Sequence, residues 1–209
     1  SEPGLFWVGT YAAGLSILKK EKRKFLKFDA RGPEGKRLLQ KSVLAIEEAG
    51  DGKVWMATDG GGLHLYDPVK FEFKNYTEQN GKIAANVITC LLRDQENNLW
   101  CGTYRKGIFK LKPGSEKIER FSKEITTGLS SNNLFSFCET EDKIWIGFVA
   151  RGIDLYDKKT GLFTRSPFDT IDQGAFARSS IFKIFKDSKN RIWIGTENSG
   201  TICYNPVKN

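Results

Sequence analysis

Histidine is nearly missing from the sequence, since His64 is the only one. This excludes zinc enzymes with several His ligands and any His-dependent relay other than one built on His64. No window contains the roughly 18 uninterrupted apolar residues that a membrane helix needs, so we predict no membrane segment. The cysteines, which are Cys90, Cys101, Cys138 and Cys203, form no CxxC pair. That argues against a metal-finger site and a disulfide framework, and we expect no metal and no cofactor.

The first residues, Ser1 to Gly4, have neither the basic start nor the apolar stretch of a signal peptide. This leaves a cytosolic protein or one whose targeting segment has been removed. Apolar residues make up 39% of the 209 residues, enough for a folded core. The net charge of +8 is compatible with a polyanionic partner, but lysines on exposed turns explain it more simply.

An internal repeat dominates the chain. A tetrapeptide that starts with Trp recurs every 45 to 48 residues and uses every tryptophan of the protein. Its copies begin at Trp7, Trp55, Trp100, Trp145 and Trp193. Each copy is followed by a glycine and a short apolar run. In the first four copies an aromatic or apolar pair comes next, which is Phe163 with Phe168 in the fourth, and then an apolar stretch before the next Trp. These last stretches are Val43 to Ile46, Val87 to Leu92, Leu134 to Cys138 and Ile181 to Phe185.

Each repeat therefore contains four short strands, which we call A (before Trp), B (the Trp strand), C (after the glycine) and D (the aromatic pair). Four antiparallel strands in a period of about 40 to 50 residues are typical of a β-propeller blade. We predict an all-β chain, a single propeller fragment over residues 1–209 with about 4.5 blades.

The Trp strand should be buried on both faces. Because strand side chains alternate, Trp and the Gly two residues later share one face, and the Gly leaves room for a neighbouring blade. The residue between them is apolar in every copy, and Cys101 is one of these residues. We therefore expect the tryptophans in the core, and Cys101 and Cys203 as buried thiols.

Three segments resemble the two-component regulator propeller repeat. They are Asn98-Leu99-Trp100-Cys101-Gly102-Thr103, Asn190-Arg191-Ile192-Trp193-Ile194-Gly195-Thr196 and Gly60-Gly61-Gly62-Leu63-His64-Leu65-Tyr66-Asp67. The resemblance extends over essentially the whole chain. The departures are Ala57 in place of Gly, Phe148 in place of Thr, and Ser199-Gly200-Thr201 in place of Gly-Gly-Leu.

The resemblance implies a sensor. Such repeats form the periplasmic part of inner-membrane hybrid two-component proteins, which recognise an oligosaccharide or related ligand and control a histidine kinase, a phosphorelay and transcription. The kinase would belong to the remainder of a parent protein, so we expect no enzymatic activity in this fragment.

In a propeller, the B–C and D–A loops open on one face, where ligands usually bind. Tyrosine, arginine, asparagine and carboxylate side chains in these loops suit a sugar, since they combine flat apolar faces with directed hydrogen bonds. The candidate ligand-binding residues are Tyr11, Asp59, Tyr104, Arg105, Lys106, Arg151, Glu197, Asn198 and Arg178. The alternative is that these are ordinary solvated loop residues.

The basic excess falls mostly outside these loops. The B–C and D–A loops each sum to about +1, the C–D connections to about +6 and the A–B turns to about −3. This weakens a nucleic-acid or strongly anionic ligand, and we expect no nucleic-acid partner.

Two other functions remain open. A propeller lyase or glycosidase would need paired carboxylates or a His in the funnel, whereas Asp59 and Glu197 are the only B–C loop carboxylates. A protein-interaction propeller of the WD type is the other alternative, but its Gly-His and Trp-Asp signatures are missing.

Strand accounting predicts strands B, C and D at the start, three complete blades, and strands A, B and C at the end. Incomplete blades expose strand edges and apolar faces. We therefore expect the remaining blades of a parent chain, or a second copy of this chain, to cover these surfaces.

Overall fold

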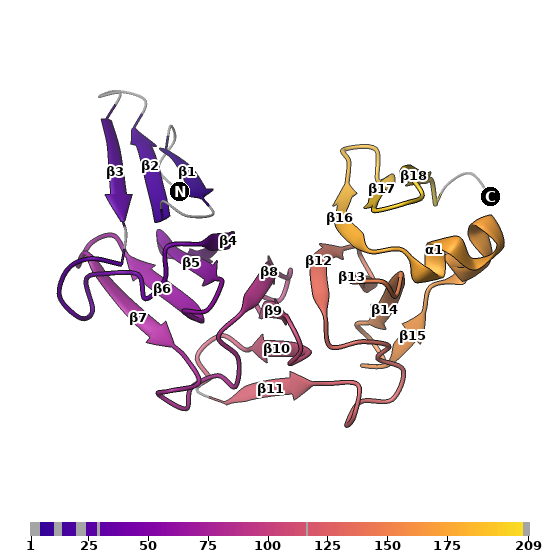
Figure 1. Cartoon of the computed structure of the whole chain (residues 1–209), viewed down its shortest axis with the longest axis horizontal. Coiled ribbons are helices and arrows are strands. Elements are labelled where there is room, and N and C mark those ends of the chain that lie inside the picture. The colour runs from indigo at the N-terminus through magenta and orange to yellow at the C-terminus, as the bar shows by residue number, and fades with distance from the viewer. Residues whose placement is uncertain (1–4, 11–13, 20–23, 29, 116, 207–209) are drawn as a thin grey trace. The chain divides into compact units, whose positions relative to one another are not determined.

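The computed structural model contains antiparallel sheets that follow one another along the chain (Figure 1). It describes residues 5–10, 14–19, 24–28, 30–115 and 117–206. The chain divides into two units, Ser1–Asn98 and Leu99–Asn209, and the division falls within the third repeat. Each unit is considered by itself below.

The first unit consists of strands only. One sheet has the order β1-β2-β3 and the next has the order β4-β5-β6-β7, and neighbouring strands in both sheets are antiparallel. The strands are β1 (Leu5–Thr10), β2 (Gly14–Lys19), β3 (Lys24–Phe28), β4 (Val43–Gly50), β5 (Lys53–Thr58), β6 (Leu63–Asp67), β7 (Glu72–Tyr76) and β8 (Ile88–Arg93).

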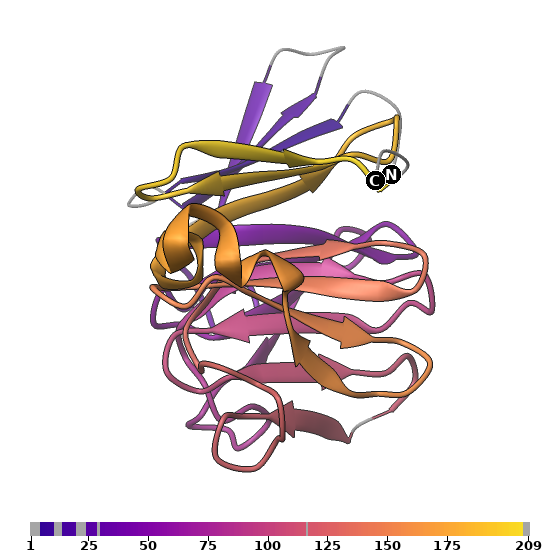
Figure 2. The same ribbon diagram turned by 90° about the vertical axis from the view of Figure 1, so that its right-hand side faces the viewer.

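The second unit adds one helical segment, the orange coil of Figure 2. Its sheets contain the orders β11-β10-β9, β12-β13-β14-β15 and β16-β17-β18. The elements are β9 (Leu99–Thr103), β10 (Ile108–Leu111), β11 (Ile118–Phe121), β12 (Leu134–Glu139), β13 (Lys143–Phe148), β14 (Ile153–Asp157), β15 (Phe163–Arg165), the 3-10 helix η1 (Pro167–Gly174), α1 (Ala175–Arg178), β16 (Ile181–Lys186), β17 (Ile192–Thr196) and β18 (Thr201–Tyr204).

The strand accounting is confirmed for the described residues. The first sheet contains strands B, C and D of its repeat, and the last sheet contains strands A, B and C. Within the described residues no helix has the length and apolar character of a membrane span.

The prediction for the end of the fourth repeat was wrong. Phe168 was assigned to strand D, but that strand ends at Arg165 and Phe168 lies in η1. The cause is packing: the Phe168 ring stacks on Trp145 with 5.8 Å between centroids, and Phe176 of α1 is fully buried beside it. The segment predicted to be an open D–A loop therefore caps the core of its sheet.

The recurring Trp-x-Gly spacing has the predicted structural role at Gly9 and Gly147. A Cβ atom on Gly147 would lie 2.7 Å from Cγ2 of Ile181, on the first strand of the following sheet. A Cβ atom on Gly9 would lie 3.0 Å from Cγ1 of Val43, again on the following sheet. In the first and fourth repeats, the Gly after Trp thus allows close packing against the following sheet.

Burial of the Trp strand is confirmed in the third and fourth repeats, whereas Trp7, Trp55 and Trp193 are only half-buried. Trp100 and Trp145 are buried, and so are Cys101 and Ile146 between Trp and Gly. In the first sheet, however, Val8 at the corresponding position is 44% exposed. An apolar residue predicted to be buried is therefore partly open to solvent there.

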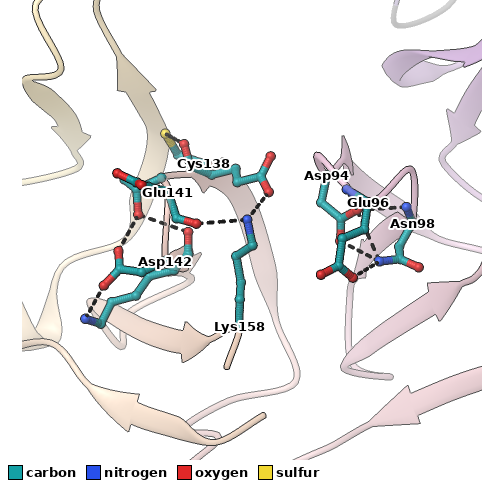
Figure 3. Close-up of polar contacts among 10 residues, drawn as sticks. Asp94, Glu96, Asn98, Cys138, Glu141, Asp142 and Lys158 are labelled. Carbon is teal, nitrogen blue, oxygen red and sulfur yellow. Dashed lines mark hydrogen bonds and ion pairs between the residues drawn. The ribbon is translucent and has the colours of Figure 1, made fainter. Parts of the chain in front are cut away.

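Two of the A–B turns, those at Asp94 and Asp187, are organised by an aspartate. Asp94 Oδ1 accepts hydrogen bonds from the N–H of Glu96 and the N–H of Asn98, at 3.0 and 2.8 Å (Figure 3). Asp187 repeats this pattern with the N–H of Arg191 and adds the indole N–H of Trp193. That indole bond to Asp187 holds the pKa of its carboxyl well below the usual range. The carboxylates predicted in these turns therefore serve structure.

The cysteines give a first testable prediction. All four are free thiols; Cys90, Cys101 and Cys138 are buried, whereas Cys203 is exposed, which corrects the prediction that it is buried. Burial also raises the pKa of the Cys138 thiol, so less of its reactive thiolate is present at neutral pH. We expect a thiol reagent to modify Cys203 rapidly and the other three only as fast as the protein opens. Mass spectrometry of the labelled chain measures this, and equal rates at all four would contradict it.

Candidate functional site

The B–C loops are closed by one recurring contact. The hydroxyl of Thr103 donates to the carbonyl oxygen of Gly107 at 2.7 Å, and the Thr103 N–H donates to the same oxygen at 3.1 Å. Thr58 and Thr196 make the corresponding pairs of bonds in their repeats. Phe148 has no hydroxyl and keeps only the backbone bond, to Gly152. The Thr of the repeat thus fixes a tight loop that presents its central residues to solvent.

Arg105 lies at the tip of one such loop in an unusual backbone conformation. Its φ is 74°, in the left-handed region that favours glycine. Counted from Trp, the corresponding residue of the second repeat is Gly60, with φ of 102°. The Arg105 N–H donates to Oδ1 of Asn133 at 2.7 Å, which connects this B–C loop to the following D–A loop.

These two loops and the next B–C loop surround an open pocket of about 500 Å³. It is lined by Arg105, Lys123, Ser130, Ser131, Asn132, Asn133, Val149, Ala150 and Arg151. The lining contains three cationic side chains and no carboxylate. The volume lies in the range of small-molecule sites, about 300 to 1,000 Å³.

Behind the pocket lies a buried carboxylate. Asp154 accepts hydrogen bonds from the N–H and the hydroxyl of Ser130, at 2.7 and 2.8 Å, and from Nη1 of Arg165 at 3.0 Å. Burial raises the pKa of the Asp154 carboxyl, while the bonds from Ser130 and Arg165 oppose that rise. Arg165 also donates to the backbone carbonyl of Arg151 at 2.7 Å. The network therefore positions the backbone on both sides of the pocket.

Arg120 has a similar role one repeat earlier. It pairs with Phe109 across β10 and β11, as Arg165 pairs with Asp154 across β14 and β15. Its Nε donates to the carbonyl of Lys106 at 3.3 Å, the residue that corresponds to Arg151. An arginine on strand D thus supports the B–C loop in both repeats.

In the second repeat, His64 occupies the strand C position that Phe109 and Asp154 occupy in the next two repeats, and it is fully buried. Its Nδ1 lies 2.7 Å from Oδ1 of Asn75, and its Nε2 lies 3.4 Å from Oγ1 of Thr58. Burial lowers the pKa of His64 to about 4. An uncharged, enclosed imidazole with two fixed neighbours is a structural group rather than an exposed general base.

The structure places the predicted site residues as follows. Arg105 and Arg151 line the pocket, and Tyr104 lies beside it with its ring 5.0 Å from the Arg105 guanidinium carbon. Outside the lining are Lys106, Arg178, Glu197 and Asn198, all exposed residues of the second unit. Asp59 belongs to the first unit, and Tyr11 lies outside the described residues.

Three residues that line the pocket from the D–A loop after β11 were not among the predicted site residues: Lys123, Ser130 and Ser131. A signal was present, because Asn132 and Asn133 mark the end of this loop. Asn132 Oδ1 accepts from the N–H of Lys123 at 2.8 Å and so folds the loop back on itself. In the part of the chain that the structure describes, no group of three or more His, Cys, Asp or Glu side chains is placed to hold a metal ion.

The sequence matches a known family. The pattern of the family described as two component regulator propeller matches residues 82–105 and 176–198. A protein of Formosa agariphila named histidine kinase P4 is 32% identical over 148 residues, which is 69% of this chain and 11% of that protein. The chain thus spans about a tenth of the length of this curated relative.

Solved structures share the fold. The extracellular domain of a protein described as a hybrid two component system of B. thetaiotaomicron has a TM-score of 0.79 at 21% identity, over 99% of this chain and 26% of that one. The WD40 β-propeller domain of Doa1 has a TM-score of 0.72 at 13% identity, over 100% of this chain and 62% of that one. The chain therefore contains two-component regulator propeller repeats at residues 82–105 and 176–198, and its antiparallel sheets are blades of a β-propeller.

Proposed function

We propose that this chain is the ligand-sensing part of a hybrid two-component sensor, located outside the cytoplasm. Its occupancy by an oligosaccharide would control a histidine kinase in the remainder of a longer protein. The observation that carries the proposal is the pocket between the loops after β9, β11 and β13, on a chain similar to a histidine kinase and to a sensor's extracellular domain.

The chemistry of the pocket suits a sugar. A saccharide presents a dense set of hydroxyl donors and acceptors, and the lining offers serine hydroxyls, asparagine amides and arginine guanidinium groups. Two of these groups are free to bind: the Asn133 side-chain NH₂ and the Ser131 hydroxyl hydrogen have no acceptor among the described residues. The carboxylates and His64 described above are used in structural hydrogen bonds, so the proposal remains a non-enzymatic binding function.

A triple substitution tests the pocket. Changing Tyr104, Arg105 and Arg151 to alanine should abolish or strongly weaken saccharide binding, because it removes two lining guanidinium groups and the ring beside them. A thermal-shift screen with neutral and acidic oligosaccharides identifies the ligand, and calorimetry gives the affinity. The matched control is Lys159→Ala with Lys189→Ala, two exposed lysines on turns that do not line the pocket. An unchanged affinity in the triple variant would disprove this site.

The proposal also includes a partner for the exposed apolar residues of β1. Phe6 and Val8 are 58% and 44% exposed. In a longer sensor, further blades would cover such residues; in the isolated chain, we expect a second copy to do so. Light scattering should show association that increases with concentration and decreases in Phe6→Ser with Val8→Ser. A monomer at every concentration would contradict the expectation of self-association.

A further inference from the structure

We infer that the pocket binds an acidic saccharide, whose carboxylate or sulfate ester is held by Arg105, Lys123 and Arg151. The inference rests on the proposed function and specifies the chemical class of its ligand. It depends on the charge of the pocket, on the backbone of Arg105 and on the way the loops are supported.

The first argument is an excess of unpaired positive charge. Within the described residues, none of the three cationic side chains of the pocket forms an ion pair. Other cationic residues of the same unit are neutralised: Lys158 Nζ lies 2.8 Å from Glu139 Oε1 and donates to the carbonyl of Glu141 (Figure 3). Like charges around one concave site repel one another, and a bound anion removes that repulsion.

The charge of the pocket lining differs from the summed charge of the loops that contribute to it. The B–C and D–A loops sum to small net charges, but the structure selects which of their residues meet. The loop carboxylates do not line the pocket, whereas Lys123 does. Glu124, next to Lys123, is held by the side-chain amide of Asn132, whose Nδ2 donates to Oε1 at 2.9 Å. The local charge is therefore more positive than the loop composition indicates.

The second argument is strain at Arg105. An L-residue in the left-handed region costs roughly 1 to 2 kcal/mol relative to its usual conformation. The second repeat uses Gly60 at the corresponding position and avoids this cost. The third repeat instead keeps an arginine there, with its N–H anchored to Asn133 and its guanidinium against the Tyr104 ring. A charged side chain retained at a strained loop tip points to a binding role.

The third argument is the support beneath Arg151. Its carbonyl accepts a hydrogen bond from Arg165, and the N–H of the preceding Ala150 donates to Oγ of Ser180 at 3.1 Å. These bonds fix the loop on both sides of the Ala150–Arg151 peptide. A guanidinium group offers two parallel donors to a planar carboxylate or to two sulfate oxygens, so a fixed arginine suits this class of ligand.

The uncharged polar groups of the lining can form hydrogen bonds with the sugar ring of the ligand. Ser131 accepts the N–H of Asn133 at 3.1 Å, which leaves its hydroxyl hydrogen to donate to a ligand. The Asn133 amide NH₂ lies at the same wall, because its Oδ1 is occupied by Arg105. Hydroxyl and amide groups beside three cations match a sugar ring that carries an acidic substituent.

The test measures calorimetric binding to matched probes. Trigalacturonic acid supplies carboxylates, its methyl-esterified form removes their charge, and a sulfated carrageenan disaccharide supplies a sulfate ester. Sodium sulfate tests the anion alone. We expect binding of one acidic saccharide, at least tenfold weaker binding of the methyl ester if the carboxylate probe binds, and weaker binding at high salt.

Two variants separate binding from folding. Arg105→Gly removes the charge and relieves the strain, so we expect about tenfold weaker binding of the acidic probe without a loss of thermal stability. Asn190→Gly is the matched control, because Asn190 has φ of 59° in a turn outside the pocket lining and its substitution changes no charge. It should leave the affinity unchanged.

The outcomes distinguish the two proposals. If a neutral oligosaccharide binds as tightly as the acidic probes and Arg105→Gly has no effect, the acidic class is overturned and the sensor function stands. If sulfate alone binds as tightly as the sulfated sugar, the saccharide part is overturned. If neither acidic probe binds, the inference fails. If no saccharide of the wider screen binds either, the proposed function fails as well.

Discussion

Gly107→Ala is expected to lower the free energy of unfolding by about 3 kcal/mol. The glycine has φ of 81°, which is unfavourable for alanine. The added Cβ would also overlap the carbonyl oxygen of Phe121 and lie 3.1 Å from Cα of Ser122. Both neighbours are backbone atoms, so no side-chain rotation removes the clash.

Gly114→Ala is the matched control for this substitution. Gly114 has a similar φ of 70°, but no heavy atom lies within 4 Å of the position of its Cβ. It should therefore cost only the conformational part, about 1 kcal/mol. Urea unfolding of both variants measures the difference. Equal destabilisation would show that the approach of Phe121 contributes nothing, contrary to the close packing of strands C and D described here.

The strands could be predicted from the sequence because their requirements are local. The Trp-x-Gly-Thr segment alternates in and out of a sheet, and the following Gly accepts the Thr bonds that close the B–C loop. Because the same loop closure recurs, the seven-residue spacing of Trp100 and Gly107 is repeated along the chain and can be recognised in a single sequence. The positions of the strands, their order and their pairing therefore follow from the length of the repeat and from the turn residues between strands.

The helical segment after β15 could not be predicted in the same way. Its sequence has no long apolar periodicity, and it is held by Phe168 against Trp145 and by the burial of Phe176. These are tertiary contacts of one repeat only. A segment whose conformation depends on what it covers leaves little trace in the repeat pattern.

The candidate site was predictable in part for a related reason. Arg105 and Arg151, both chosen by loop position, line one concavity, because adjacent B–C loops lie side by side in consecutive blades. The inclusion of Lys123 depends on the path of a ten-residue loop from Ser122 to Ser131, fixed by Asn132. Residue type could not show that Glu124 turns to Asn132 while Lys123 joins the lining.

His64 provides a pH-dependent test of the first unit. Its pKa in the folded chain is about 4, below its ordinary value of 6.5, because burial disfavours the imidazolium form. Between these values the unfolded chain binds a proton that the folded chain does not. The stability contributed by neutral His64 is therefore complete above pH 6.5 and is lost as the pH falls toward 4, by about 3 kcal/mol in total.

His64→Phe is the matched variant, since Phe109 occupies the corresponding position in the next repeat. The substitution leaves Oδ1 of Asn75 without the imidazole, which shifts the stability by an amount that does not depend on pH. The carboxylates titrate equally in both proteins. Urea unfolding from pH 7 to pH 4 should therefore give a difference between wild type and variant that changes by about 3 kcal/mol. Because the chain has no other histidine, parallel curves would mean that the folded protein admits a charged imidazole, and that His64 is less enclosed by Thr58 and Asn75 than described here.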